Sequence, residues 1–152
     1  MPSIARRVIP FGTTIFTEVN DLARQHEAVN LGQGKPDFDG PFEAVEAFTK
    51  ALQGGYNQYP PGQGLPILRQ AVANHAARAY GLEVDPNGGV QITPGATEAI
   101  FASVMGLVDP GDEVIVIEPF FDSYVPDILM AGAVPVFVPM HAPDWTFDPD
   151  EL

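Results

Sequence analysis

Segments typical of β-strands and α-helices alternate through the second half of this chain, and this alternation limits the fold more than any other feature. Residues 114–117 (VIVI) and 134–138 (VPVFV) are nearly continuous apolar runs, which are typical of parallel strands covered on both faces. Residues 90–93 (VQIT) predict a third strand, and helical periodicity occupies residues 97–108 and 125–130 between the strands. Two βαβ units result, so we predict an α/β fold with a mainly parallel sheet flanked by helices.

The first half of the chain favours helices joined by segments rich in glycine and proline. Apolar stripes predict helices near residues 16–23, 41–52 and 66–80. A short apolar run at 28–31 predicts a strand, and the Pro- and Gly-rich segment 57–64 should run over a surface or into a neighbouring molecule. On the third helix the side chains expected to face inward are Leu68, Ala71, Val72 and Ala76.

Charge and composition exclude several classes of function. The 152 residues include 20 acidic and 7 basic ones, and the formal net charge of -13 would repel nucleic-acid phosphates and anionic membranes. The absence of cysteine rules out disulfides, a thiol nucleophile and thiolate metal ligands, and the cytoplasm is the expected location. No apolar stretch approaches the ~18 residues of a transmembrane helix, and the histidines lack the spacing of a metal site.

Small residues follow the predicted strand 90–93, where a helix begins. At the carboxyl end of a parallel strand, Gly95 lets the backbone approach a ligand closely, and the N–H groups of Ala96 and Thr97 would point at an anion. A plain tight turn before a capped helix explains the same residues equally well.

Aromatic residues follow the next strand in the segment 118–124 (EPFFDSY). Phe120 and Phe121 could stack on a planar ring, or they could simply bury against the sheet. Asp122 and Ser123 could cap the helix beyond.

In sequence, the chain resembles the N-terminal part of the class I/II aminotransferases of fold type I, which depend on pyridoxal 5'-phosphate (PLP). The motifs that carry the resemblance run in the family's order along nearly the whole chain, and the subgroup resembled comprises kynurenine, methionine and N-succinyldiaminopimelate aminotransferases. The resemblance implies a PLP-dependent transferase-like fold, with residues 1–40 forming an arm, a helix and the start of a small domain, and 41–152 the incomplete first part of the large PLP-binding domain. The motifs are VNLGQG (29–34), NQY (57–59), GATEA (95–99), GDEV (111–114) and EPFFDSY (118–124).

The resemblance also implies roles in cofactor binding. Gly95, Ala96 and Thr97 match the turn that holds the PLP phosphate, and Phe121 matches the aromatic residue that stacks on the pyridine ring. Tyr59 matches a tyrosine that reaches across a homodimer interface to the phosphate of the neighbouring site.

Substrate and catalytic residues are implied less completely. Gly34 matches a glycine whose backbone lies against the substrate carboxylate, and Phe16 falls at an aromatic wall of the substrate pocket. The two lysines, Lys35 and Lys50, do not match the Schiff-base lysine, which is expected beyond Leu152. A helix start at 148–151 also suggests an N-terminal fragment that is inactive alone.

Three functions remain open at this point. The first is transfer of an amino group between an amino acid and a 2-oxo acid. The second is a catalytically inactive α/β module that binds an anion or a partner chain, and the third is a carbon–sulfur β-lyase that uses PLP on the same scaffold.

Overall fold

A computed structural model of the chain describes residues 4–34 and 36–151. The backbone divides into two compact units, one formed by Met1–Gln33 with Pro94–Leu152 and the other by Gly34–Thr93. Each unit is described by itself below. The expected division of the large and small domains at residues 40 and 41 stays a prediction.

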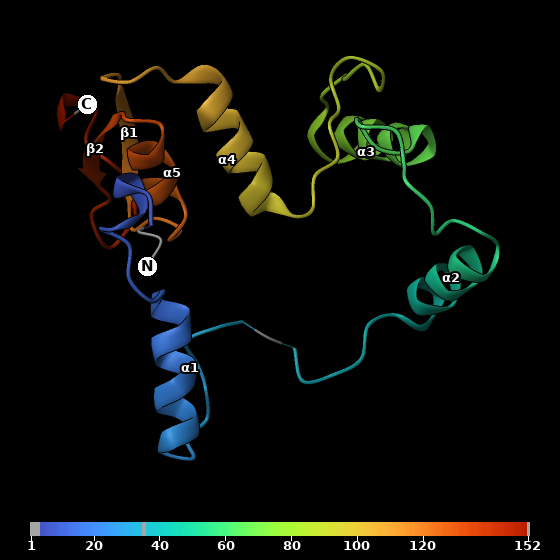
Figure 1. Cartoon of the computed structure of the whole chain (residues 1–152), viewed down its shortest axis with the longest axis horizontal. Coiled ribbons are helices and arrows are strands. Elements are labelled where there is room, and N and C mark those ends of the chain that lie inside the picture. Colours follow the sequence, from blue (N-terminus) through green and yellow to red (C-terminus); the bar gives the residue numbers. More distant parts are fainter. Residues whose placement is uncertain (1–3, 35, 152) are drawn as a thin grey trace. The chain divides into compact units, whose positions relative to one another are not determined.

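A parallel βαβ element forms the centre of the first unit (Figure 1). Strand β1 (Glu113–Glu118) pairs in parallel with β2 (Val134–Pro139), and helix α5 (Tyr124–Met130) connects them. Helix α4 (Ala96–Leu107) packs against α5. The described part of this unit therefore confirms the predicted α/β class, with the predicted strands 114–117 and 134–138 in parallel register.

The core of this unit lies between the sheet and α5. Val116 of β1, Ile128 of α5 and Ala133 pack together, and each is less than 5% exposed. Val138 of β2 is 1% exposed. Burial of β-branched side chains from both strands is what stabilises the parallel pair, because apolar area removed from water supplies most of the favourable free energy.

Short elements at both ends of the chain complete the first unit. These are η1 (Arg6–Val8), helix α1 (Ile15–Gln25) and η2 (Pro149–Glu151). Thr14 caps α1 by accepting a hydrogen bond from the Thr17 N–H at 3.3 Å.

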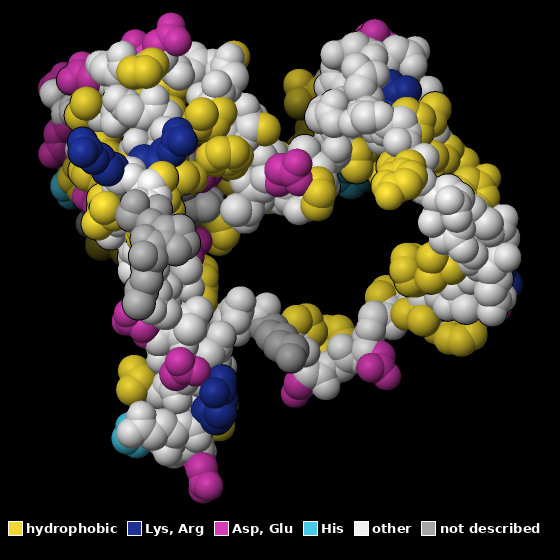
Figure 2. Space-filling view, viewed as in Figure 1, with side chains coloured by type: hydrophobic (Ala, Val, Ile, Leu, Met, Phe, Trp, Pro, Cys, Tyr) yellow, Lys and Arg dark blue, Asp and Glu magenta, His cyan; other side chains and the backbone are white. Residues whose placement is uncertain are grey.

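The described residues of the second unit form two helices, α2 (Phe42–Gln53) and α3 (Pro66–Tyr80). Pro66 occupies the first turn of α3, and Gly81 ends it in the left-handed conformation at φ 67°, as the sequence predicts. The apolar stripe of α2 lies on the surface (Figure 2). It consists of Phe42, Val45, Phe48 and Leu52.

The predicted inward face of α3 is wrong. The buried side chains of this helix are Arg69 and Ala73, whereas Leu68 and Val72 are exposed. The reason is that the loop of residues 85–89 covers the Arg69 side of the helix, where backbone carbonyls bind the guanidinium group.

Two predicted strands are also absent from the described part of the chain. They are residues 90–93 and 28–31. A strand needs a hydrogen-bonded neighbour, and apolar composition alone does not supply one. Within 90–93 the Ile92 N–H instead donates to the Gln63 carbonyl at 3.1 Å.

Across residues 4–34 and 36–151, none of the helices combines the length and apolar character needed to cross a bilayer.

Candidate functional site

The turn before α4 exposes a helix N-terminus that has no capping side chain. Gly95 is the N-cap residue, and its φ of 96° and ψ of 166° lie in a region that glycine enters far more readily than other residues. A Cβ there would meet no atom within 4 Å, so the backbone conformation, and not crowding, requires glycine. First-turn N–H groups and the helix dipole favour an anion beside Ala96 and Thr97.

A hollow of about 610 Å³ opens beside this helix end. Thr97 lines it together with Asp122, Ser123 and Asp127, and residues 8 and 10–14 of the N-terminal arm supply much of the remaining lining. The Thr97 hydroxyl is therefore available to a ligand in a partly enclosed space and is not packed into the core.

Two polar side chains in this hollow have buried atoms without a hydrogen-bond partner among the described residues. They are Oγ of Ser123 and Oδ2 of Asp127, whose residue is only 4% exposed. Burial raises the pKa of Asp127 above its ordinary value of 3.8, because a buried carboxylate loses hydration. Sequence reasoning missed Asp127, although a single acidic residue within an apolar helix was a usable signal.

The predicted capping role of Ser123 is wrong. Ser123 does occupy the N-cap position of α5, but its side chain makes no capping hydrogen bond. Its backbone has helical angles, φ -79° and ψ -22°, whereas a capping residue normally has extended angles that turn its side chain toward the helix N–H groups.

The two adjacent phenylalanines after β1 have different surroundings. The Phe120 ring stacks on Phe137 of β2, with centroids 5.6 Å apart and an interplanar angle of 26°. The Phe121 ring instead contacts Phe16 of α1 at 6.3 Å and Tyr124 of α5 at 5.9 Å. Both rings are partly exposed, by 37% for Phe120 and 42% for Phe121, so the difference lies in their contacts. Phe137 is stacked on Phe120, whereas the ring contacts of Phe121 are tilted or edge-on and leave it available for stacking.

The contact between Phe16 and Phe121 brings together two residues that the sequence assigned to different tasks. Phe16 was expected at a substrate wall and Phe121 at the cofactor ring, and their rings are tilted by 44° to each other. These two side chains and the α4 turn belong to the same compact unit.

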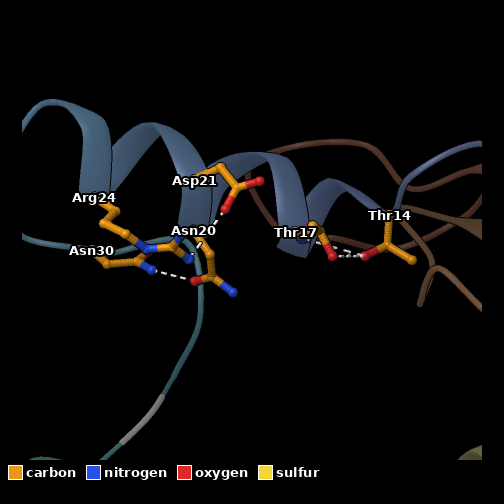
Figure 3. A network of polar contacts seen from close by, with 6 residues as sticks. All are labelled: Thr14, Thr17, Asn20, Asp21, Arg24 and Asn30. Atoms are coloured by element: carbon orange, nitrogen blue, oxygen red, sulfur yellow. Dashed lines mark hydrogen bonds and ion pairs between the residues drawn. The ribbon is translucent and has the colours of Figure 1, made fainter.

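Polar contacts hold the segment before Gly34 against α1 (Figure 3). The Asn30 side-chain amide donates to Oδ1 of Asn20, and Oδ1 of Asn30 accepts from the Gly32 N–H at 3.0 Å. Gly32 packs so closely on Val19 that a Cβ would overlap its side chain. By contrast, Gly34 has open space around it, and a Cβ there would meet nothing within 4 Å.

Tyr59 lies in the second unit, on the irregular segment between α2 and α3. Its side chain is fully exposed at 101%. A hollow of about 450 Å³ is lined by residues 57–60. A tyrosine normally buries part of its ring, so full exposure leaves this one free to contact another molecule.

Lys50 does not take a place that suggests covalent chemistry. Lys50 is exposed on α2 and forms an ion pair with Glu46 at 3.0 Å. Lys35 lies outside the described residues.

Comparison with known proteins identifies the class to which this chain belongs. The family model "Aminotransferase class I and II" matches residues 26–152. The chain therefore belongs to the class I and II aminotransferases.

Two curated relatives are named for particular substrates. A protein of Mycobacterium tuberculosis named probable N-succinyldiaminopimelate aminotransferase DapC is 51% identical over 149 residues, which cover 96% of this chain and 37% of the relative. The methionine aminotransferase of Escherichia coli K12 is 42% identical over 152 residues, which cover 99% of this chain and 39% of that protein.

Solved structures agree with these similarities. The structure of N-succinyldiaminopimelate aminotransferase from M. tuberculosis superposes with a TM-score of 0.90 at 49% identity, covering 98% of this chain and 39% of that one. The structure of YbdL from E. coli, assigned a methionine aminotransferase function, superposes with a TM-score of 0.90 at 41% identity. The match covers 99% of this chain and 40% of the YbdL chain. The chain thus spans under two fifths of the length of the curated relatives described above, at 37% and 39%.

Proposed function

We propose that the chain is the N-terminal part of an aminotransferase that moves an amino group between an amino acid and a 2-oxo acid, with PLP as its cofactor. One observation carries the proposal most directly. A helix N-terminus without a capping side chain, at Gly95, and a partly exposed aromatic ring, at Phe121, lie in one compact unit. Both residues fall within the range that the family model matches. A phosphorylated aromatic cofactor needs both features.

The residues present fit PLP chemically. Its phosphate needs donors, which the N–H groups of Ala96 and Thr97 and the Thr97 hydroxyl supply, and Gly95 keeps side-chain atoms out of the approach. The pyridine ring needs a flat apolar surface, which Phe121 supplies. When bound, PLP supplies an electron sink for the carbanion that forms when the substrate loses its α-proton.

The chain's own contribution is to hold and orient. The helix N-terminus would fix the phosphate, and Phe121 would set the plane of the ring. Gly34 would leave its backbone open to the substrate carboxylate, and Phe16 would bound the side-chain pocket. Held in this way, the reacting groups lose little additional entropy during the reaction.

We further propose a homodimer in which Tyr59 reaches the phosphate of the neighbouring subunit. The full exposure of Tyr59 supports this role, since no described residue of its own unit covers the ring. We expect the enzyme to act in the cytoplasm, and fractionation of cells that produce a tagged enzyme would test this location.

Amino transfer tests the proposal. The complete enzyme, supplied with PLP, would be mixed with 2-oxoglutarate and a panel of amino donors: N-succinyldiaminopimelate, methionine and kynurenine. We expect at least one donor to yield glutamate, measured by chromatography, and enzyme stripped of PLP to yield none. Failure of every donor to give an amino acid product would overturn the proposal. Release of pyruvate and ammonia from a cysteine S-conjugate without glutamate formation would instead favour the β-lyase.

A further inference from the structure

The most unusual polar group outside the site is the guanidinium of Arg69, on α3 in the second unit. Arg69 is only 8% exposed, and among the described residues it forms no ion pair. Its Nη1 donates to the carbonyl oxygens of Pro86 at 2.7 Å and Asn87 at 3.4 Å, and lies 3.5 Å from Oε1 of Gln63. A buried cation is costly unless its donors are bound, so the contacts of Nη1 are needed to keep Arg69 in place, the more so because its buried Nε has no hydrogen-bond partner among the described residues.

The carbonyls that bind Arg69 are presented by a tight turn. Asp85 accepts hydrogen bonds from the N–H groups of Asn87 at 3.0 Å and Gly88 at 3.1 Å, and its carbonyl accepts from Gly89 at 2.8 Å. This turn is therefore preorganised, and Arg69 joins it to α3.

The same region is tied to the end of the segment that carries Tyr59. The Gln91 side chain donates to the Gly62 carbonyl at 2.8 Å, and the Ile92 N–H donates to the Gln63 carbonyl at 3.1 Å. Gly64 is buried at φ +95°, where a Cβ would overlap the Ile92 side chain. Residues 62–64 are thus fixed on several sides, whereas Tyr59, a few residues before them, is fully exposed.

We propose that Arg69 is a positioning residue for Tyr59. By bridging the Gln63 side chain and the carbonyls of Pro86 and Asn87, it helps to fix the base of the Tyr59 segment, so that the phenol is presented to the phosphate of a neighbouring subunit. This inference rests on the proposed function. It adds to that function the polar contacts that give the Tyr59 segment its conformation.

A double-mutant cycle on PLP affinity tests the proposal in the complete dimeric enzyme. PLP would be titrated into apoenzyme, with quenching of protein fluorescence as the readout. We expect Tyr59→Phe to weaken binding about tenfold, which is what loss of one charge-assisted hydrogen bond implies. Arg69→Lys should weaken binding to a similar extent, and the double variant should bind no worse than Tyr59→Phe to within about twofold.

Controls separate positioning from loss of folding. Arg78→Lys, on the exposed part of the same helix, should leave PLP affinity unchanged. If Arg69→Lys fails to fold, Gln91→Met removes a different tie to the same segment, and its effect should likewise disappear in the Tyr59→Phe background. Independent, multiplicative losses in these cycles would overturn the role of Arg69. An unchanged affinity of Tyr59→Phe itself would instead overturn the proposed role of Tyr59 at the phosphate.

Discussion

The two units of this chain are stabilised by different means. The unit around β1 and β2 buries branched apolar side chains such as Val116 and Ile128. The Gly34–Thr93 unit buries a guanidinium group and leaves the apolar stripe of α2 in solvent. The unit that carries the proposed phosphate turn and ring-stacking residue is therefore stabilised by apolar packing between β1 and α5, whereas directed hydrogen bonds fix residues 62–64, which follow Tyr59.

The difference implies different sensitivities to substitution. A packed core responds to lost volume wherever it occurs, because neighbouring side chains cannot fully close a cavity. A hydrogen-bonded segment responds only at the groups that donate or accept. The contrast between the two units can therefore be tested with pairs of substitutions, one at a buried and one at an exposed position, or one at each of two neighbouring residues.

The largest expected effect is on the stability of the packed unit. Ile128→Ala should lower the free energy of unfolding by about 2–5 kcal/mol, because it opens a cavity under the sheet. Urea denaturation followed by circular dichroism measures this change. The matched control is Ile67→Ala on α3, where the side chain is 74% exposed and a change within about 0.5 kcal/mol is expected. Equal losses at the two positions would contradict the contrast between the units.

The next effect concerns the backbone of the phosphate turn. Gly95→Ala should destabilise the chain by about 1–3 kcal/mol, since alanine does not readily adopt φ 96°. Gly106→Ala, inside α4 with open space around it, should instead stabilise by about 0.5–1 kcal/mol. Thermal unfolding of both variants measures the difference, and a stabilising Gly95→Ala would show that the turn does not require glycine.

In the unit around β1 and β2, substitutions of the neighbouring Phe120 and Phe121 should distinguish an effect on PLP binding from an effect on packing. Phe121→Leu should weaken PLP binding to the complete apoenzyme by about 0.5–1.5 kcal/mol, or up to about tenfold, through loss of ring stacking. Phe120→Leu should leave PLP affinity unchanged, because its ring stacks on Phe137. Fluorescence titration distinguishes the two, and a larger loss from Phe120→Leu would reverse the assignment.

The smallest effect is a change in pH dependence at Asp127. Its pKa in the folded state lies above the unfolded value of 3.8, so the folded state binds this proton more tightly. The resulting stabilisation is present below pH 3.8 and is lost as the pH rises through the folded-state pKa. Asp127→Asn should therefore be more stable than the parent chain at about pH 7 and should lose this advantage as the pH falls toward 3.8. A difference that does not vary with pH would contradict this explanation.

Sequence patterns predicted the unit around β1 and β2 better than they predicted the Gly34–Thr93 unit. The runs at 114–117 and 134–138 are strands, because β-branched side chains and a short crossover helix suffice to specify a parallel pair. The run at 90–93 has similar composition but bonds to the segment before α3. Composition describes what a segment prefers and does not identify its hydrogen-bonding partner.

The candidate site shows the same limit. The glycine at 95 and the aromatic pair at 120–121 could be found from the sequence, but only the structure separates the two rings. Asp127 and Arg69 were missed as buried groups, since charged residues are normally exposed and their burial depends on distant segments.

The most direct test of the central claim is a crystal structure of the complete enzyme with PLP. We predict that phosphate oxygens lie within hydrogen-bonding distance of the Ala96 and Thr97 N–H groups and the Thr97 hydroxyl, with the pyridine ring stacked on Phe121. Tyr59 should approach the same phosphate from the other subunit. A phosphate bound away from the α4 turn, or a ring that does not contact Phe121, would contradict the account.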